Sequence, residues 1–280
     1  MTETIDRKRV KAAFHRQAED YDSHALVQKR VVGHVLKEVQ REAGEPQLVL
    51  DVGAGTGRLL AGLHRIYPKL RAVGADLAFG MCLTARANFK DCGRVQLVTA
   101  DAESLPFADG VFDLVTSTST YQWLTSLELA FKEAWRVLAP GGLFCFALFG
   151  QRTLFELKDS YRLALNNASQ QGEDRTHRFF AATDVAAALE CAGFSHCRAD
   201  AELELEYHAD VSALLRSLKR IGAGNAAPVA PRGLAGRRVM LEMMDVYRSK
   251  YANADGIPAT YEVVYGAGRK QHKEVSALIC

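Results

Sequence analysis

The sequence predicts an α/β protein whose centre is a doubly wound, mainly parallel sheet of seven strands. From about residue 45 onward, short apolar runs alternate with amphipathic helical segments, a pattern typical of parallel strands joined by crossover helices. The first of these runs ends in the glycine-rich turn 51–57, and a helical pattern over 59–65 follows at once. Ligands of such sheets bind at the carboxyl ends of the strands, so we expect the functional site there.

The chain is long enough for a single α/β domain with additions. It has 280 residues, of which 48% are hydrophobic and 24% charged, as in ordinary globular proteins. We expect one domain over 1–280 with four parts. These are an N-terminal helical lid (1–44), a ligand-binding core (45–150), a helical insertion (151–181), and a C-terminal part of the sheet with basic helices (182–280).

Charge and composition exclude several classes of protein. The formal net charge of +2 gives no overall attraction to nucleic acid or to a membrane surface. No apolar run approaches the roughly 20 residues that span a bilayer, and residues 1–11 lack the apolar centre of a secretory signal. The six cysteines form no CxxC pair, so we expect no metal site and a cytoplasmic location.

The remaining patterns assign the other elements. Polar and apolar residues alternate over 202–207, which predicts a sixth strand with one face in solvent. Thr183 is the expected N-cap of a helix that ends at Gly193. A turn is expected over 139–142. The predicted helices are 6–19, 23–43, 59–65, 127–138, 154–165, 183–192, 210–221 and 237–251, and the predicted strands are 49–52, 72–75, 95–99, 112–117, 143–148, 202–207 and 261–265.

The glycine turn indicates a nucleotide-like cofactor. Glycine lacks a Cβ and tolerates positive φ, so Gly53, Ala54, Gly55 and Gly57 form a turn in which bare backbone can contact a ligand. The helix that follows presents free N–H groups at its N-terminus. A dinucleotide-binding turn has the spacing G-x-G-x-x-G, whereas here the third glycine comes one residue early, which disfavours a nicotinamide oxidoreductase.

Acidic side chains follow the first three strands. Asp76 ends the second strand, where a carboxylate can accept hydrogen bonds from two ribose hydroxyls, and Asp101 follows the third, where it suits the exocyclic amine of adenine. The alternative is that both aspartates only cap helices. The candidate cofactor residues are Asp51, Gly53, Ala54, Gly55, Gly57, Asp76, Leu77, Asp101, Ala102, Glu103, Ser117 and Thr118.

In this order, the motifs over residues 45–150 resemble the class I S-adenosylmethionine-dependent methyltransferases. Other strings narrow the resemblance: Phe14-x6-Tyr21, Gln122-Trp123, the run 149–157 (FGQRTLFEL) and the ending 260–266 (TYEVVYG). They are similar to the biotin-pathway methyltransferases that esterify malonyl-acyl carrier protein (the BioC family). Thr118 departs from the pattern, because the family usually has asparagine there.

The resemblance implies methyl transfer from S-adenosylmethionine to the free carboxylate of malonyl-acyl carrier protein. The product, a malonyl methyl ester, primes pimeloyl synthesis for biotin. Because a carboxylate with a pKa near 4 is already ionised at neutral pH, no general base is needed, and catalysis rests on alignment of the reacting atoms. The expected catalytic residues are Tyr21, Tyr121 and Trp123 in the wall and lid and Arg152 on the malonyl group.

Each of these assignments has a simpler alternative. Tyr121 and Tyr21 are also compatible with ordinary aromatic core packing, and Arg152 with an exposed solubility residue. His24 and His177 lie in segments that could cover the site, but we interpret them as structural or surface residues.

The expected partner is the acyl carrier protein itself. Carrier proteins are typically acidic, and residues 211–250 are rich in Arg and Lys, with Arg216, Lys219 and Arg220 on neighbouring turns of one helix face. The alternative is an ordinary solvated helix face. Two other functions remain open: a methyltransferase for a free small acid or another small nucleophile, and a non-methylating assembly factor of the same fold.

Overall fold

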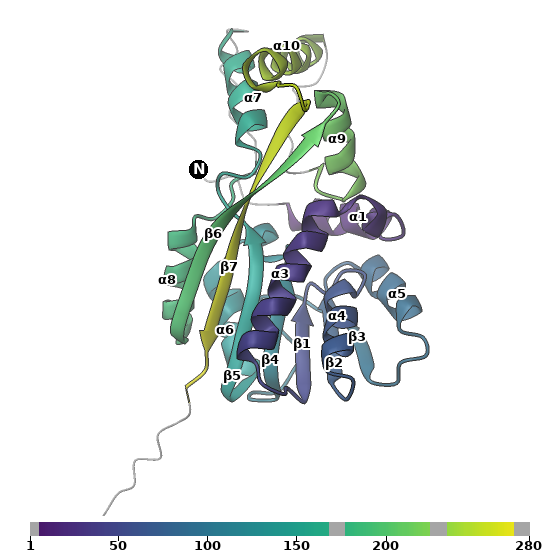
Figure 1. Cartoon of the computed structure of the whole chain (residues 1–280), viewed down its shortest axis with the longest axis vertical. Helices are drawn as coiled ribbons and strands as arrows, with labels where there is room; N and C mark the ends of the chain where they lie inside the picture. The colour runs from purple at the N-terminus through teal and green to yellow at the C-terminus, as the bar shows by residue number, and fades with distance from the viewer. Residues whose placement is uncertain (1–5, 168–176, 225–233, 272–280) are drawn as a thin grey trace, which may run out of the picture.

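The computed structural model describes residues 6–167, 177–224 and 234–271. Its seven-stranded sheet has the order β3-β2-β1-β4-β5-β7-β6, and β7 alone runs antiparallel to its neighbours (Figure 1). The predicted doubly wound, mainly parallel sheet is therefore confirmed. The strands are β1 (Leu48–Val52), β2 (Arg71–Asp76), β3 (Val95–Thr99), β4 (Phe112–Thr118), β5 (Leu138–Phe149), β6 (Ser195–His208) and β7 (Ile257–Arg269).

Helices cover both faces of the sheet. On one face the apolar sides of α3 and α4 pack against alternate residues of β1, β4, β5 and β7, and on the other α6 and α8 bury their apolar sides against the intervening residues. The helical segments are α1 (Arg7–Gln17), α2 (Tyr21–His24), α3 (Leu26–Glu42), α4 (Arg58–Ile66), α5 (Phe79–Asn88), η1 (Tyr121–Trp123), α6 (Leu127–Val137), α7 (Phe155–Asn167), α8 (Ala182–Ala192), α9 (Val211–Arg220) and α10 (Leu234–Tyr251).

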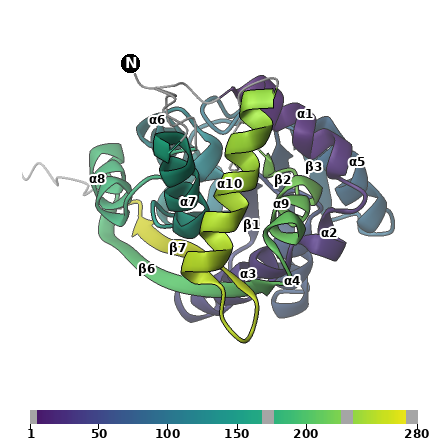
Figure 2. The ribbon, with the colours of Figure 1, turned by 90° about the horizontal axis from the view of Figure 1, so that it is seen from above.

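Two groups of helices lie beyond the carboxyl ends of the parallel strands. The helix α1 lies at this end of the sheet and contacts α5 (Figure 1). Further up, the long antiparallel strands β6 and β7 extend past the other strands, and α7, α9 and α10 pack at this end. Seen from above, α10 lies between α7 and α9 and contacts both (Figure 2). The strand ends at which the site is predicted are therefore covered by α1 of the N-terminal segment and by α7, α9 and α10 of later segments.

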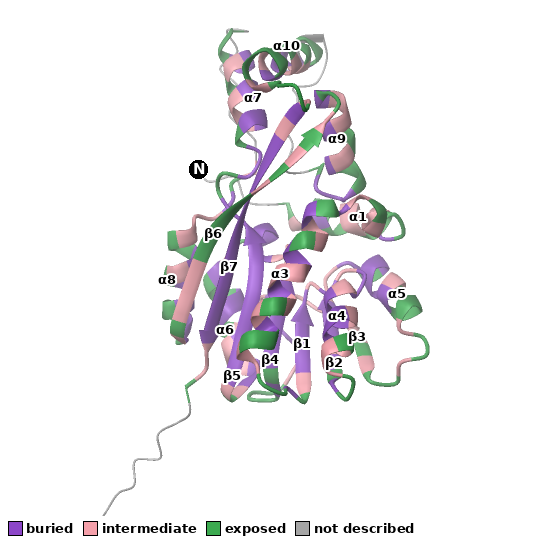
Figure 3. Ribbon diagram, in the orientation of Figure 1, coloured by how far each residue is buried: buried purple, intermediate pink, exposed green. Residues whose placement is uncertain are grey.

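The strands β6 and β7 are held to α7, α9 and α10 by a polar contact as well as by apolar packing. The Tyr247 hydroxyl of α10 donates to the Pro258 carbonyl (2.7 Å), and burial raises the pKa of this phenol. The central strands β5 and β7 are buried along most of their length, whereas the edge strand β6 is largely exposed (Figure 3). Position in the sheet thus explains why only β6 shows an alternating sequence pattern.

Several predicted element boundaries were wrong, and the helix α5 was not predicted. Residues 139–142 belong to β5, because the Lys270 backbone exchanges hydrogen bonds with Gly141 and Gly142. The strand β6 begins at Ser195, since β7 supplies hydrogen-bond partners that period-two patterning does not reveal. Thr183 is not the cap of α8: the helix begins one residue earlier, and the Asp184 carboxylate accepts from the Ala181 N–H (2.9 Å).

Candidate functional site

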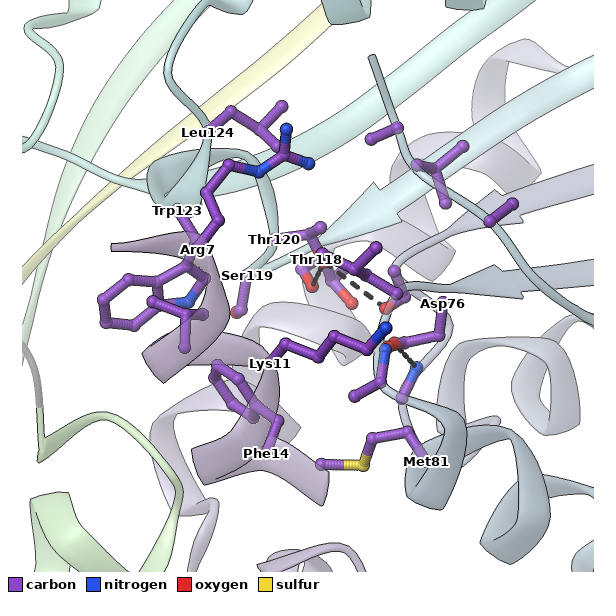
Figure 4. Close-up of a pocket in the computed structure, with 18 of the residues that line it drawn as sticks. Arg7, Lys11, Phe14, Asp76, Met81, Thr118, Ser119, Thr120, Trp123 and Leu124 are labelled. Carbon is purple, nitrogen blue, oxygen red and sulfur yellow. Dashed lines mark hydrogen bonds between the residues drawn. The ribbon is translucent and has the colours of Figure 1, made fainter. Parts of the chain in front are cut away.

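A cavity of about 760 Å³ lies at the carboxyl ends of β1, β2 and β4, under α1 (Figure 4). We name it the glycine-loop cavity. It is lined by Arg7, Val10, Lys11, Phe14, Tyr21, Val52, Gly53, Gly55, Asp76, Leu77, Ala78, Met81, Ala100, Ala102, Thr118, Ser119, Thr120, Trp123 and Leu124.

The glycine turn forms one wall of this cavity. Gly53 has φ +72°, and its N–H donates to the Ala75 carbonyl (2.7 Å), which fastens the turn to β2. A Cβ built on Gly53 would lie 1.9 Å from Thr120 Oγ1, so only glycine fits there. Gly57 has φ +85° and starts α4. The turn therefore requires glycine for backbone conformation at both ends and for space at Gly53.

Asp76 reaches the cavity wall at the end of β2. Its Oδ2 accepts from the Gly55 N–H (2.9 Å) and its Oδ1 from the Ala78 N–H (2.7 Å). Burial raises the pKa of this carboxyl, and the two backbone hydrogen bonds oppose that rise. Each carboxylate oxygen keeps lone-pair capacity for a further donor. This arrangement fits the ribose of a nucleoside ligand such as S-adenosylmethionine.

Asp51 lies behind the glycine turn and does not line the cavity. It is 1% exposed, accepts from the Thr116 hydroxyl (3.0 Å), and has a pKa raised to about 8, chiefly by burial and further by the Asp76 charge. Ala54 is also buried outside the lining. These two residues support the turn from behind.

The acids after β3 are paired with an N-terminal arginine. Arg7 of α1 donates to Asp101 Oδ1 and to Glu103 Oε2, both at 2.5 Å, and Glu103 also accepts from the Ser126 N–H (3.0 Å). Neither acid lines the cavity, whereas Ala100 and Ala102 beside them do. Sequence reasoning missed Arg7 and Lys11. The pattern of helix 6–19 gave no signal for which of its basic residues lie over the site.

Figure 4 shows the Lys11 side chain extending across the cavity toward Asp76. Three further contacts fasten the N-terminal segment. His15 Nδ1 accepts from the Gly80 N–H (2.9 Å), and the Asp22 carboxylate accepts from the Thr56 hydroxyl (3.0 Å) and pairs with Arg58 (3.0 Å). The segment therefore closes the cavity on the side away from the sheet.

A second cavity of about 390 Å³ adjoins the first. The two share four lining residues, Phe14, Tyr21, Ser119 and Trp123. The others are Gln28, Gln122, Phe149, Thr153, Leu154, Phe179, Leu218, Ile221, Ala223 and Tyr261. None of the described residues that line the second cavity carries a charged side chain.

The two family-like strings at 149–157 and 260–266 lie against each other beside the second cavity. The Leu154 N–H donates to the Thr260 carbonyl (2.7 Å), and the Thr260 hydroxyl donates to the buried Glu156 carboxylate. The Glu262 carboxylate accepts from the Arg152 N–H (3.0 Å). These contacts hold the 150–154 turn, in which Leu154 has φ +55°, against β7.

Two of the expected catalytic residues lie elsewhere. The Arg152 side chain is exposed and lines neither cavity. Tyr121 is fully buried, and its ring packs edge-on against Phe131, Phe144 and Phe146. The expected place of Tyr121 in the wall of the site is therefore wrong, because the short helix η1 turns this ring into the aromatic core and directs Trp123 to the cavities.

The remaining candidates divide between the site and its surroundings. Leu77, Ala102 and Thr118 line the glycine-loop cavity, and Tyr21 and Trp123 line both cavities. Burial and the charges of Asp22 and Asp76 raise the pKa of the Tyr21 phenol. Ser117 is fully buried within β4 and lines neither cavity.

The two histidines have different surroundings. The His177 ring packs at a tilt against Trp123 and edge-on against Phe179, and its Nε2 donates to the Gln122 carbonyl (2.9 Å). Burial lowers the pKa of this imidazole to about 4, so the ring supports the second cavity as a neutral donor. His24 lies beside Arg220 of α9 (3.3 Å).

The helix α9 has one face on the second cavity and one in solvent. Leu218 lines the cavity, as does Ile221 just past the helix end, while Arg216, Lys219 and Arg220 are exposed. The helix begins at Asp210, whose carboxylate accepts from the Ala213 N–H (2.6 Å). No helix in the described part of the chain is long and apolar enough to cross a membrane.

Comparisons with known proteins agree with this geometry. Residues 50–146 match the family described as "Methyltransferase domain". Two solved structures share the fold. The YcgJ protein of Bacillus subtilis is 19% identical, with 86% of this chain and 99% of that chain covered and a TM-score of 0.59. A putative methyltransferase of Bacillus halodurans C-125 is 20% identical, with 85% of this chain and 99% of that chain covered and a TM-score of 0.59. The fold and the matched domain define the protein as a methyltransferase.

Full-length relatives define the family more closely. The malonyl-[acyl-carrier protein] O-methyltransferase of Geobacter sulfurreducens is 56% identical, covering 95% of this chain and 100% of its own length. The malonyl-[acyl-carrier protein] O-methyltransferase of Halorhodospira halophila is 37% identical, covering 94% of this chain and 88% of its own length. The chain belongs to the malonyl-[acyl-carrier protein] O-methyltransferase family.

Proposed function

We propose that this protein transfers a methyl group from S-adenosylmethionine to the free carboxylate of malonyl-acyl carrier protein, in the cytoplasm. The malonyl methyl ester so formed would start the pimeloyl chain of biotin. One observation carries the proposal: a second cavity without charged lining residues adjoins the glycine-loop cavity and shares four residues with it. The 56% identity to a malonyl-[acyl-carrier protein] O-methyltransferase supports the same reaction.

The glycine-loop cavity has the groups needed to hold S-adenosylmethionine. The backbone of Gly53 and Gly55 would lie along the ligand, Asp76 would accept from the ribose hydroxyls, and Ala102 and Leu77 would flank the adenine. Asp101 would reach the adenine amine only after Arg7 releases it. When bound, the cofactor supplies a methyl group made electrophilic by the adjacent sulfonium. The described parts of the N-terminal segment (6–44) and of the insertion (151–167 and 177–181) would cover the bound ligand.

The neutral lining of the second cavity suits a reaction that cancels charge. A carboxylate oxygen lone pair forms the new O–C bond while the C–S bond breaks and its electron pair stays on sulfur, and no proton moves. Negative and positive charge both diminish on the way to the transition state. A guanidinium beside the carboxylate would stabilise the charged ground state more than the transition state and so slow the reaction. An acceptor site without Arg152 is consistent with this chemistry.

The basic side of α9 is the proposed docking surface for the carrier protein. Arg216, Lys219 and Arg220 are exposed on a helix that also contributes Leu218 to the second cavity. An acidic carrier protein bound there would bring its acyl group to the cavity that α9 borders. Complementary charge of this kind raises the association rate more than the final affinity.

The test is a mass measurement with matched acceptors. Purified protein is incubated with S-adenosylmethionine and either malonyl-carrier protein, acetyl-carrier protein or free malonate. We expect the mass gain of one methyl group on malonyl-carrier protein alone. Gain on free malonate of equal efficiency would favour the small-acid methyltransferase, and no gain on any acceptor despite cofactor binding would favour the non-methylating assembly factor.

A charge reversal tests the docking surface. Changing Arg216, Lys219 and Arg220 together to glutamate should raise KM for malonyl-carrier protein and flatten its salt dependence. Turnover of malonyl-coenzyme A should change far less, because that substrate has no protein surface to dock. Parallel loss with both substrates would show that the cluster supports folding or the active site.

A further inference from the structure

The junction of the two cavities contains one small hydroxyl side chain, and it has no assigned role. We propose that the Ser119 hydroxyl binds the acceptor carboxylate, donating a hydrogen bond to the oxygen that does not attack the methyl group. Ser119 thereby selects acyl groups that end in a carboxylate. This inference rests on the proposed function and adds to it the residue that determines acceptor specificity.

The backbone of Ser119 is held in an unusual conformation. Its φ is +55°, in a region that non-glycine residues rarely adopt. The Ser119 N–H donates to the Ala147 carbonyl (2.8 Å), and the Gln122 side-chain amide donates to the Ser119 carbonyl (2.7 Å). Such strained residues persist where the surroundings fix them, and they cluster at functional sites.

The hydroxyl of Ser119 is available to a ligand. Ser119 lines both cavities, and its Oγ has no hydrogen-bond partner within residues 6–167, 177–224 and 234–271. Two neighbouring hydroxyls are occupied: Thr120 Oγ1 donates to the carbonyls of Gly53 (3.3 Å) and Thr118 (3.1 Å). Thr153 Oγ1 both donates to the Glu262 carbonyl and accepts from the Glu262 N–H.

The other shared residues are aromatic, and they complete the junction without replacing this donor. Phe14 has no polar group. The Trp123 indole N–H is buried and lacks a partner among the described residues, so a ligand can reach it only after the surrounding side chains move. Tyr21 comes from the N-terminal segment that covers the cavities. Ser119 is therefore the donor that the sheet itself presents at the junction.

A neutral donor suits both sides of the reaction. The oxygen that accepts from Ser119 becomes the carbonyl oxygen of the ester, so the hydrogen bond persists when the carboxylate charge disappears. A cation in the same place would lose its ion pair at that moment. An acceptor without a terminal carboxylate, such as an acetyl group, would leave the Ser119 hydroxyl unsatisfied, and an unmade buried hydrogen bond disfavours that ligand.

Binding to the full-length protein loaded with S-adenosylhomocysteine tests the inference without turnover. The variants are Ser119→Ala and Ser119→Gly, which both remove the hydroxyl while only glycine relieves the positive φ. The control is Ser195→Ala, whose hydroxyl donates to the Arg269 carbonyl (3.1 Å) at the far end of β6. Calorimetry measures the affinity for malonyl-carrier protein and for acetyl-carrier protein, and separately for S-adenosylhomocysteine.

We expect the preference for the malonyl over the acetyl form to fall about 10- to 100-fold in both Ser119 variants, the effect of one hydrogen bond to a charged group. Affinity for S-adenosylhomocysteine should stay within about twofold, and the control should match the parent. An unchanged preference in either Ser119 variant would overturn the inference, because both variants lack the hydroxyl. Failure of the parent to methylate malonyl-carrier protein would instead refute the proposed function.

Discussion

The two adjoining cavities are built in opposite ways. The glycine-loop cavity has charged side chains in its wall, with Asp76, Arg7 and Lys11 in its lining. The second cavity has only aromatic, aliphatic and neutral polar residues among its described lining. The difference shows that one fold can hold a charged nucleoside ligand beside a site of low polarity. The shared residues at the junction are where opposite charges would meet and cancel.

The cavities also differ in how they are assembled. Short-range geometry forms most of the first one, since the glycine turn and Asp76 follow consecutive parallel strands. The lining of the second one includes residues from the segment 119–123 after β4, the 150–154 turn, α9 and β7, which are far apart in the chain. Changes in the first should therefore act on the cofactor alone, and changes in the second on the acceptor alone.

The largest expected effect is from Gly53→Ala. A Cβ there meets Thr120 Oγ1 at 1.9 Å and forces alanine to φ +72°. We expect loss of measurable S-adenosylmethionine binding by calorimetry, with the free energy of unfolding lowered by about 1–3 kcal/mol. Gly93→Ala is the matched control, because nothing lies within 4 Å of its Cβ position. Normal cofactor affinity in Gly53→Ala would separate the turn from the cofactor site.

The next effect is from Asp76→Ala. It removes the proposed ribose acceptor and the two hydrogen bonds from Gly55 and Ala78. S-adenosylmethionine binding should weaken by roughly 1–3 kcal/mol, the scale of a lost hydrogen bond with a charged partner. Asp76→Asn keeps one acceptor oxygen and should lose less. Unchanged affinity in the alanine variant would remove Asp76 from the site.

A smaller effect is expected on stability at low pH, and it results from His177 beside the second cavity. The folded-state pKa of His177 is lowered to about 4 by burial, while the unfolded chain has about 6.5. Between these values the unfolded state binds more protons, so stability falls as pH drops through this window and does not change with this group above it. The loss should be about 1 kcal/mol at pH 5.5.

Urea unfolding at pH 7.0 and 5.5 measures this loss. The variant His177→Phe keeps an aromatic ring against Trp123 and Phe179 but cannot titrate. The pH dependence of its stability should therefore be smaller than that of the parent. Identical pH dependence in both proteins would show that His177 does not carry the effect.

The smallest expected effect is from Arg152→Ala. Sequence reasoning assigned Arg152 to the malonyl group, whereas its side chain is exposed outside both cavities. We expect kcat/KM for malonyl-carrier protein to change by no more than about twofold, because exposed substitutions away from a site cost about 0.5 kcal/mol or less. A fall of tenfold or more, with unchanged cofactor affinity, would restore the assignment and break the contrast between the cavities.

The sequence by itself determined the parts that depend on local spacing. Parallel strands place their carboxyl ends at one edge of a sheet, so Gly53 and Asp76 could be assigned to a common site from strand ends alone. The strings 149–157 and 260–266 indicated the family, and the identity to full-length relatives confirmed it.

Only the tertiary structure decided the rest, because it depends on contacts between distant residues. Arg7 meets Asp101 across 94 positions, and no local pattern marks that pair. Periodicity does not show that Tyr121 points into the aromatic core, since the direction is set by how the short helix η1 joins β4. The neutrality of the described lining of the second cavity results from segments far apart in the chain packing together, and charged residues of these segments, such as Arg152 and Arg216, point elsewhere.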